Sequence, residues 1–177
     1  MRMMLAVTVC AFVYAAGMAA QQTSSEQKSE KQSSSSMGAM HDPHGQMNER
    51  GEKGMGFSQT STAHHFLLNA NGGVIQVETK DPADAVGRDE IRMHLGHIRQ
   101  AFQNGEFDIP MFVHDTVPPG EEEMRRLKKK IRYSYEERLN GGRVVIFSTD
   151  KKAQSAIHKF LRFQIEEHKT GDPEEVR

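Results

Sequence analysis

The chain has 177 residues and a formal net charge of −1 at pH 7. This near balance argues against nucleic acid as the main partner, because phosphate binding needs a clear basic excess. The single cysteine, Cys10, lies in an apolar N-terminal stretch that we expect to be removed. The mature protein would then have no disulfide and no thiolate, so any metal site must use His, Met or carboxylate ligands.

The first residues have the order of a cleavable signal peptide. Arg2 supplies a basic start, Leu5 to Ala16 is apolar, and Gly17 and Ala19 are the small residues before a polar run. The apolar stretch is too short to span a bilayer, which takes about 20 residues. We expect residues 1–19 to be the signal, cleavage after Ala19, and a periplasmic or secreted protein without a membrane span.

The composition divides the rest of the chain. A Ser- and Gln-rich tail at residues 22–36 has no large apolar side chain and should be disordered. Residues 37–56 interleave Met and His with Gly and charged residues, and are expected to form a flexible arm. We therefore predict a tail and arm over residues 20–56, a folded domain over residues 57–172, and a C-terminal tail over residues 173–177.

The folded domain opens with a hairpin signal. Phe66 to Leu68 and Val74 to Val77 flank Asn71-Gly72, and Asn-Gly between apolar runs favours a tight turn. A two-residue turn there would place Leu68 opposite Ile75 and Phe66 opposite Val77. His64 would lie at the end of the same face.

A helical period follows the first hairpin. Ile91, Leu95, Ile98 and Phe102 predict a helix from about Ala85 to Phe102, closed by Asn104-Gly105. Further segments are expected as follows: an extended edge strand or ordered loop within residues 107–114, and a charged helix over residues 121–130 with acids first and bases last.

The second half repeats this order. Residues 131–135 and 143–148 predict a hairpin around Asn140-Gly141-Gly142. A last helix, capped by Thr149 or Asp150, should run to about Lys169.

The two halves can be aligned as an internal duplication. Both contain Asn-Gly-Gly, a Val/Ile strand and an amphipathic helix. The fold class predicted is therefore α+β: two ββα units forming a four-stranded antiparallel sheet with the helices on one face. The alternative is coincidence, since a hairpin followed by a helix is a common unit.

Aligning the helices on Ile91 and Ile157 places His94 and His97 against Phe160 and Phe163. Packing explains the phenylalanines, whereas imidazoles need polar partners. Histidines three residues apart on a helix are neighbours and can share an ion, although a purely structural pair is the alternative. We expect further ligands from the rest of the chain: His64, His114, or His41, His44 and Met47 of the arm. Imidazole with thioether in an oxidising compartment suits copper.

Catalytic motifs are lacking in the sequence. It contains no G-x-S-x-G, P-loop or G-x-G-x-x-G pattern, and the adjacent His114-Asp115 pair is a poor start for a triad. An enzyme is therefore the least favoured of the functional classes.

Several segments together resemble a family of small exported bacterial proteins. They include Thr62-Ala63-His64-His65-Phe66, Arg92-Met93-His94-Leu95, residues 108–115, Pro118-Pro119-Gly120 and residues 160–165. Some members carry the name aspartate carbamoyltransferase. This sequence does not support that activity, because it has neither the length for two doubly wound domains nor a Ser-Thr-Arg-Thr phosphate loop. The resemblance implies no catalytic residues, but it does imply that residues 50–57 belong with the domain.

Two functional hypotheses remain. The first is an extracytoplasmic protein that holds or passes on a metal ion, copper above all. The second is a metal-free domain that binds an extracytoplasmic protein, a peptide or a small ligand through its open sheet face or through residues 107–120.

Overall fold

The computed structural model describes residues 43–177. The predicted signal peptide, the Ser/Gln tail and residues 37–42 of the predicted arm lie outside the described residues. The strands are β1 (Thr62–Asn69), β2 (Gly72–Thr79), β3 (Arg132–Arg138) and β4 (Gly141–Phe147). The helices are α1 (Pro43–Met55), α2 (Ala85–Asn104), α3 (Asp108–His114), α4 (Glu121–Arg126) and α5 (Lys151–His168), with a 3-10 turn η1 (Lys128–Lys130).

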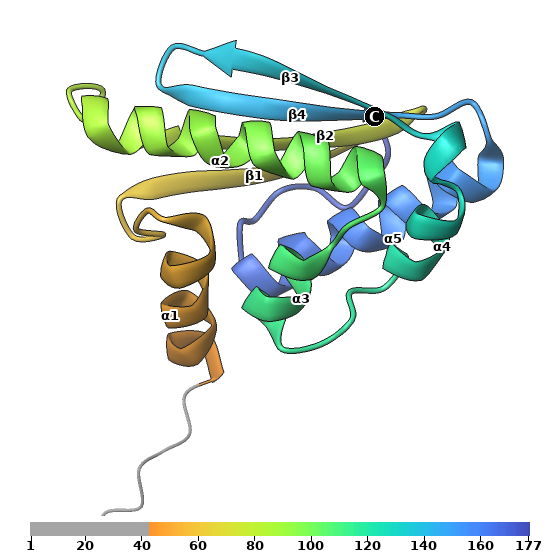
Figure 1. The fold of residues 1–177 in the computed structure, drawn as a ribbon, viewed down its shortest axis with the longest axis horizontal. Helices are drawn as coiled ribbons and strands as arrows, with labels where there is room; N and C mark the ends of the chain where they lie inside the picture. The colour runs from red at the N-terminus through yellow and green to blue at the C-terminus, as the bar shows by residue number, and fades with distance from the viewer. Residues whose placement is uncertain (1–42) are drawn as a thin grey trace, which may run out of the picture. The chain divides into compact units, whose positions relative to one another are not determined.

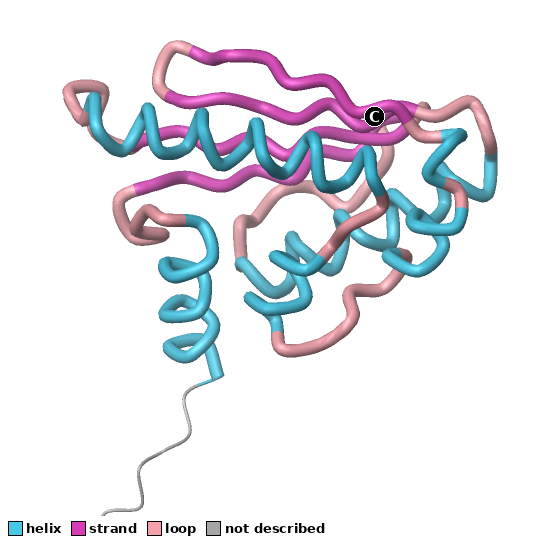
Figure 2. Tube along the Cα trace, viewed as in Figure 1, coloured by secondary structure: helices cyan, strands magenta, loops and turns pink. Residues whose placement is uncertain are grey.

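The strands form one antiparallel sheet in the order β1-β2-β4-β3 (Figure 2). Helix α2 packs mainly on β3 and β4, and α5 packs on β1 and β2 (Figure 1). Each long helix therefore covers the hairpin of the other half. Their buried residues join the inward side chains of the sheet in one core. The predicted α+β class, with a four-stranded antiparallel sheet and the long helices on one face, is confirmed.

The first hairpin has a different register from the one predicted. Phe66 pairs with Ile75 and His64 with Val77, and the two-residue loop is Ala70-Asn71. Among the described non-glycine residues only Asp115 and Lys169 have a positive φ, so Asn71 does not form the predicted Asn-Gly turn. Gly72 has a φ of 143° instead, and a Cβ there would lie 2.1 Å from the Ile146 carbonyl oxygen. The shift is by an even number of residues, so every side chain keeps its predicted face.

The second hairpin repeats this geometry. Its two-residue loop is Leu139-Asn140, again one residue earlier than the glycines suggested, and a Gly-Gly pair again begins the return strand. The two return strands, β2 and β4, pair with each other at the centre of the sheet through Ile75 and Val144. This order is what a two-fold arrangement of ββα units would have; the duplication itself stays a prediction.

The long helices begin and end as the sequence predicts. Asp84 accepts a hydrogen bond from the Gly87 N–H at the start of α2, and Gly105 ends that helix in the left-handed conformation. Asp150 caps α5 through the N–H groups of Lys152 and Ala153. The predicted stripe of Ile91, Leu95, Ile98 and Phe102 is buried.

The expectation of an extended segment at residues 107–114 is wrong. Residues 108–114 form helix α3, with Asp108 and Pro110 in its first turn. An acidic residue suits the positive end of a helix, and Pro is tolerated there because the first N–H groups have no partner in the helix. Seven residues are too few for a helical period to show in the sequence.

The predicted arm is also corrected for residues 43–55, which form α1. Met47 is buried, and the Arg50 Nε–H donates to the Val113 carbonyl oxygen at 2.9 Å. Gly54 lies close to the side chains of Phe112 and Val113. Helix α1 therefore packs on α3, and the folded domain includes these residues rather than beginning at Phe57.

The C-terminal residues run along the outer edge of β1. Asp172 accepts the Phe66 N–H at 2.9 Å and pairs with His65 Nδ1 at 3.0 Å. Arg177 exchanges backbone hydrogen bonds with Leu68 and Ala70. These contacts satisfy edge groups of β1 that could otherwise pair with another chain.

Candidate functional site

Histidines from four different elements line one cavity of about 60 Å³ under the sheet. We call it the histidine cavity. Its imidazoles are those of His64 on β1, His94 on α2, His114 on α3 and His168 at the end of α5. Gln164 and Met55 also line it, and the other walls are mainly apolar: Phe66, Ile75, Val77, Leu95, Ile98, Phe102, Ile109, Pro110, Val113 and Phe160.

The periodicity of each element directs these side chains inward. His64 alternates with the buried Phe66 and Leu68 on the inner face of β1. His94 lies next to Leu95, at the edge of the buried stripe of α2. His168 follows the buried Phe160 and Gln164 at intervals of four residues, so all three share one face of α5.

The rings are in contact with one another or with a shared aromatic neighbour. His64 stacks on His168 with the ring centroids 5.6 Å apart and the planes 9° apart. His114 meets His168 edge to face at 5.0 Å. Phe57 bridges the other pair, since its ring lies 6.0 Å from His64 and 5.5 Å from His94.

Some buried nitrogen atoms of this cluster have no hydrogen-bond partner among the described residues. Nε2 of His114 and Oε1 of Gln164 are 3.0 Å apart, so the Nε2–H of a neutral His114 donates to the amide. His114 Nδ1 then carries a lone pair. Within residues 43–177, neither this Nδ1 atom nor the buried Nε2 of His64 has a hydrogen-bond partner. The buried Nε2 of Gln164, which also lines the cavity, has none either. Buried polar atoms are normally paired, so three such nitrogens at one cavity point to a ligand.

Burial keeps these imidazoles neutral. Desolvation, with a smaller repulsion from His94, lowers the pKa of His64 to about 4. Desolvation also lowers the pKa of His94 to about 4, with a smaller contribution from repulsion by His97. The pKa of His168 is lowered to about 3, mainly by desolvation and less by repulsion from His64 and His114. The pKa of His114 is also lowered, by desolvation first. At neutral pH each ring therefore offers one unprotonated nitrogen.

The predicted ligands are only partly brought together. His64, His94 and His114 line the cavity, whereas His97 is exposed on α2 and does not. Met47 is buried, yet it is not part of the lining. His41 lies outside the described residues, and so does the side chain of His44. The cavity therefore contains only His94 of the predicted His94–His97 pair.

His168, Gln164 and Met55 were missed as site residues. The sequence did carry a signal for the first two, because Phe160, Gln164 and His168 recur at helical spacing. Met55 could not be assigned from the sequence, because the Gly- and charge-rich composition of its helix predicts a flexible arm. In the described part of the chain, no three His, Cys, Asp or Glu side chains are already placed to hold an ion.

A polar groove of about 340 Å³ adjoins the histidine cavity. His64 and His168 line both, so these two rings form the wall between them. Lys80, Lys169 and Thr60 line the groove on its outer side.

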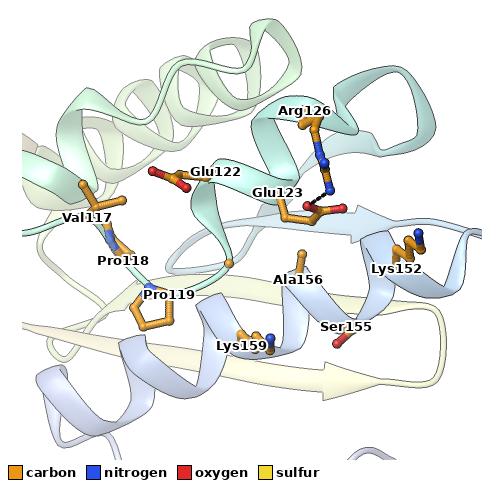
Figure 3. A pocket seen from close by; sticks show the side chains of 11 residues that line it. Val117, Pro118, Pro119, Glu122, Glu123, Arg126, Lys152, Ser155, Ala156 and Lys159 are labelled. Carbon is orange, nitrogen blue, oxygen red and sulfur yellow. Dashed lines mark hydrogen bonds and ion pairs between the residues drawn. The ribbon is translucent and has the colours of Figure 1, made fainter.

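A larger groove of about 700 Å³ lies elsewhere, between the turn before α4 and the exposed side of α5 (Figure 3). Lys152 and Lys159 line it from α5, and Arg126 is paired with Glu123 on α4. Its charged groups are mostly exposed or already paired. Solvated groups of this kind bind ligands weakly, so the histidine cavity is the stronger candidate.

The described part of the chain contains no helix long and apolar enough to cross a membrane. Comparison with family models, with curated proteins and with solved structures finds no match to this chain.

Proposed function

We propose that this chain is an exported protein that binds a soft metal ion, copper, in the histidine cavity. The observation that carries the proposal is the convergence of four largely desolvated, neutral imidazoles on one small cavity. Two of their buried nitrogens, His64 Nε2 and His114 Nδ1, lack a hydrogen-bond partner among the described residues. Neutral imidazole nitrogen is the form of histidine that binds metals. The thioether of Met55 adds a soft ligand to the same lining.

The spacing of the rings supports this proposal. Two imidazoles that bind one ion through bonds of about 2.0 Å have centroids about 5 Å apart. The centroids of His64 and His168 are 5.6 Å apart, and those of His114 and His168 are 5.0 Å apart. The parallel stacking of His64 on His168 would have to give way to rotation of the rings about χ2, which is a soft torsion in histidine.

The ligand set differs from the one that the sequence predicted. His168 takes the place of His97, because α5 ends against β1 while His97 points away from the cavity. His94 belongs to the set through its position beside Phe57. The binding of copper and the extracytoplasmic location are both part of the proposal.

Single substitutions by Phe test this assignment. Each of His64, His94, His114 and His168 would be replaced, with His97→Phe as the matched control on the surface of α2. Elemental analysis after equilibrium dialysis against copper should show stoichiometric metal in the parent and in the control. The His64 and His168 variants should lose most of it. Equal loss in the His97 control would contradict the proposal, provided circular dichroism shows every variant folded.

The metal-free interaction domain remains the second candidate. The outer face of the sheet carries Leu67, Val74 and Val145 side by side across three strands, and none of them is fully buried. Absence of metal from the parent protein under these conditions would favour this reading, and contacts would then be sought on that face.

A further inference from the structure

The described lining of the histidine cavity offers no anionic ligand for a bound cation. Among the described residues that line it, none is Asp or Glu. The Glu167 carboxylate lies 3.9 Å from His114 Nδ1, but its side chain is 41% exposed and does not line the cavity. Asp172, on the outer edge of β1, is already paired with His65. A cation in the cavity would therefore be held by uncharged ligands.

Positive charges lie beside the same cavity. Arg50 is anchored by its hydrogen bond to the Val113 carbonyl, and its charge acts on His114, where the opposite charge of the half-exposed Glu167 acts more strongly. Lys80 is anchored to the Thr60 carbonyl oxygen at 2.8 Å, and its charge acts on His64. Both charges repel a bound cation, and the repulsion grows with the charge of the ion.

The missing anionic ligands and the neighbouring positive charges should favour a monovalent cation over a divalent one. The free energy needed to remove an ion from water into a medium of low dielectric constant rises with the square of its charge, so a divalent ion loses about four times as much as a monovalent one. Thiolate or carboxylate ligands often compensate a buried divalent ion, and the described lining offers neither. Neutral imidazole and thioether ligands are adequate for a soft monovalent ion.

The size of the cavity acts in the same direction. The cavity is small, about 60 Å³, and its walls are mainly apolar. An ion bound by several of these imidazoles must therefore shed part of its hydration shell. Hard ions such as Mg²⁺ give up that shell reluctantly.

We propose that the histidine cavity selects a monovalent soft cation, Cu(I), over Cu(II) and Zn(II), with Met55 supplying the thioether ligand. This inference rests on the proposed function. It implies that the protein binds copper in its reduced state and binds the common divalent ions much more weakly.

The test compares ions on the exported, processed protein. Ag(I) serves as a probe of the same charge and softness that needs no reductant, and Cu(I) is presented without oxygen in competition with a chromophoric chelator. Cu(II) and Zn(II) are titrated by calorimetry. Cu(I) and Ag(I) should bind at least about 100-fold more tightly than Zn(II). Cu(II) or Zn(II) affinity equal to that for Ag(I) would overturn the inference and leave the proposed function standing. Failure of every ion to bind would contradict both.

Two pairs of variants test the contribution of the thioether and that of the missing carboxylate separately. Met55→Ile removes the thioether and should weaken Ag(I) binding about 10-fold, whereas the exposed Met93→Ile should not change it. Gln164→Glu adds a carboxylate to the cavity at nearly constant shape and should shift the preference toward Zn(II). Gln100→Glu adds the same charge at an exposed position of α2 and should leave the preference unchanged. An unchanged Zn(II) to Ag(I) ratio in a folded Gln164→Glu protein would refute the charge argument.

Discussion

The imidazoles of His64 and His168 are nearly parallel neighbours, with centroids 5.6 Å apart and planes 9° apart. One ring comes from the first strand of the domain and the other from the last turn of its last helix. Two protonated rings would repel each other in this arrangement. The stacking therefore requires at least one neutral ring, in agreement with the lowered pKa values of both.

The metal-free protein should lose stability in mild acid. Above pH 6.5 the cavity histidines are neutral in the folded and unfolded states alike. Below it the unfolded chain takes up protons, whereas folded His64, His94 and His168 stay neutral down to pKa values of about 4, 4 and 3. Each should lower the free energy of unfolding by about 1.4 kcal/mol per pH unit in this window.

Urea denaturation between pH 7 and pH 5 measures this slope. His168→Phe should reduce the slope by about the contribution of one group. A free energy of unfolding that stays constant from pH 7 to pH 5 would show that the cavity imidazoles protonate freely in the folded protein.

Two glycines should respond in opposite ways to alanine. A Cβ on Gly73 would lie 2.2 Å from the Leu161 side chain and 2.5 Å from the Leu67 carbonyl oxygen, so Gly73→Ala should destabilise the protein by about 2 kcal/mol. Outside the adjoining backbone of α2, no described atom lies within 4 Å of a Cβ placed on Gly96, in the middle of that helix, so Gly96→Ala should stabilise the protein by about 1 kcal/mol. Thermal denaturation measures the change in stability of each variant. Changes of the same sign would contradict the close packing of α5 on the sheet at Gly73.

Asp172 should hold the first strand in place beside the cavity. Its carboxylate accepts the Phe66 N–H at 2.9 Å, so Asp172→Ala leaves that donor unpaired and should cost about 1–3 kcal/mol. Asp172→Asn keeps an acceptor for the N–H and should cost less. Hydrogen exchange at the Phe66 amide reports the contact directly. Equal exchange rates in the parent and in the Ala variant would mean that the C-terminal residues do not protect this edge.

The sequence predicted the sheet and the long helices because their signals are local. Alternation placed His64, Phe66 and Leu68 on the inner face of β1, and the helical period placed Leu95 in the core. The hairpin register differs by two residues from the prediction, because an Asn-Gly turn would place a glycine in the loop. Gly72 is instead needed where its backbone approaches Ile146 on the neighbouring strand, a contact between segments far apart in the chain.

The candidate site was harder to predict because it is assembled by tertiary contacts. The pair of His94 and His97 was visible from spacing, but spacing along one helix does not show which residue faces the core. His114 and His168 come within 5.0 Å of each other only because α3 packs against the end of α5. Met55 reaches the cavity through a helix rich in Gly and charged residues, whose composition resembles that of a linker.

Nitrogen NMR of the imidazole side chains during addition of Ag(I) tests most directly whether the cavity histidines bind the ion. His97 and His158 serve as internal controls, because His97 is exposed and His158 is held by the Asn69 carbonyl. We predict that the ring nitrogen signals of His64, His114 and His168 shift together and saturate at a stoichiometric amount of Ag(I), while those of the two controls stay in place. Shifts confined to His97, or none in the cavity, would contradict the account.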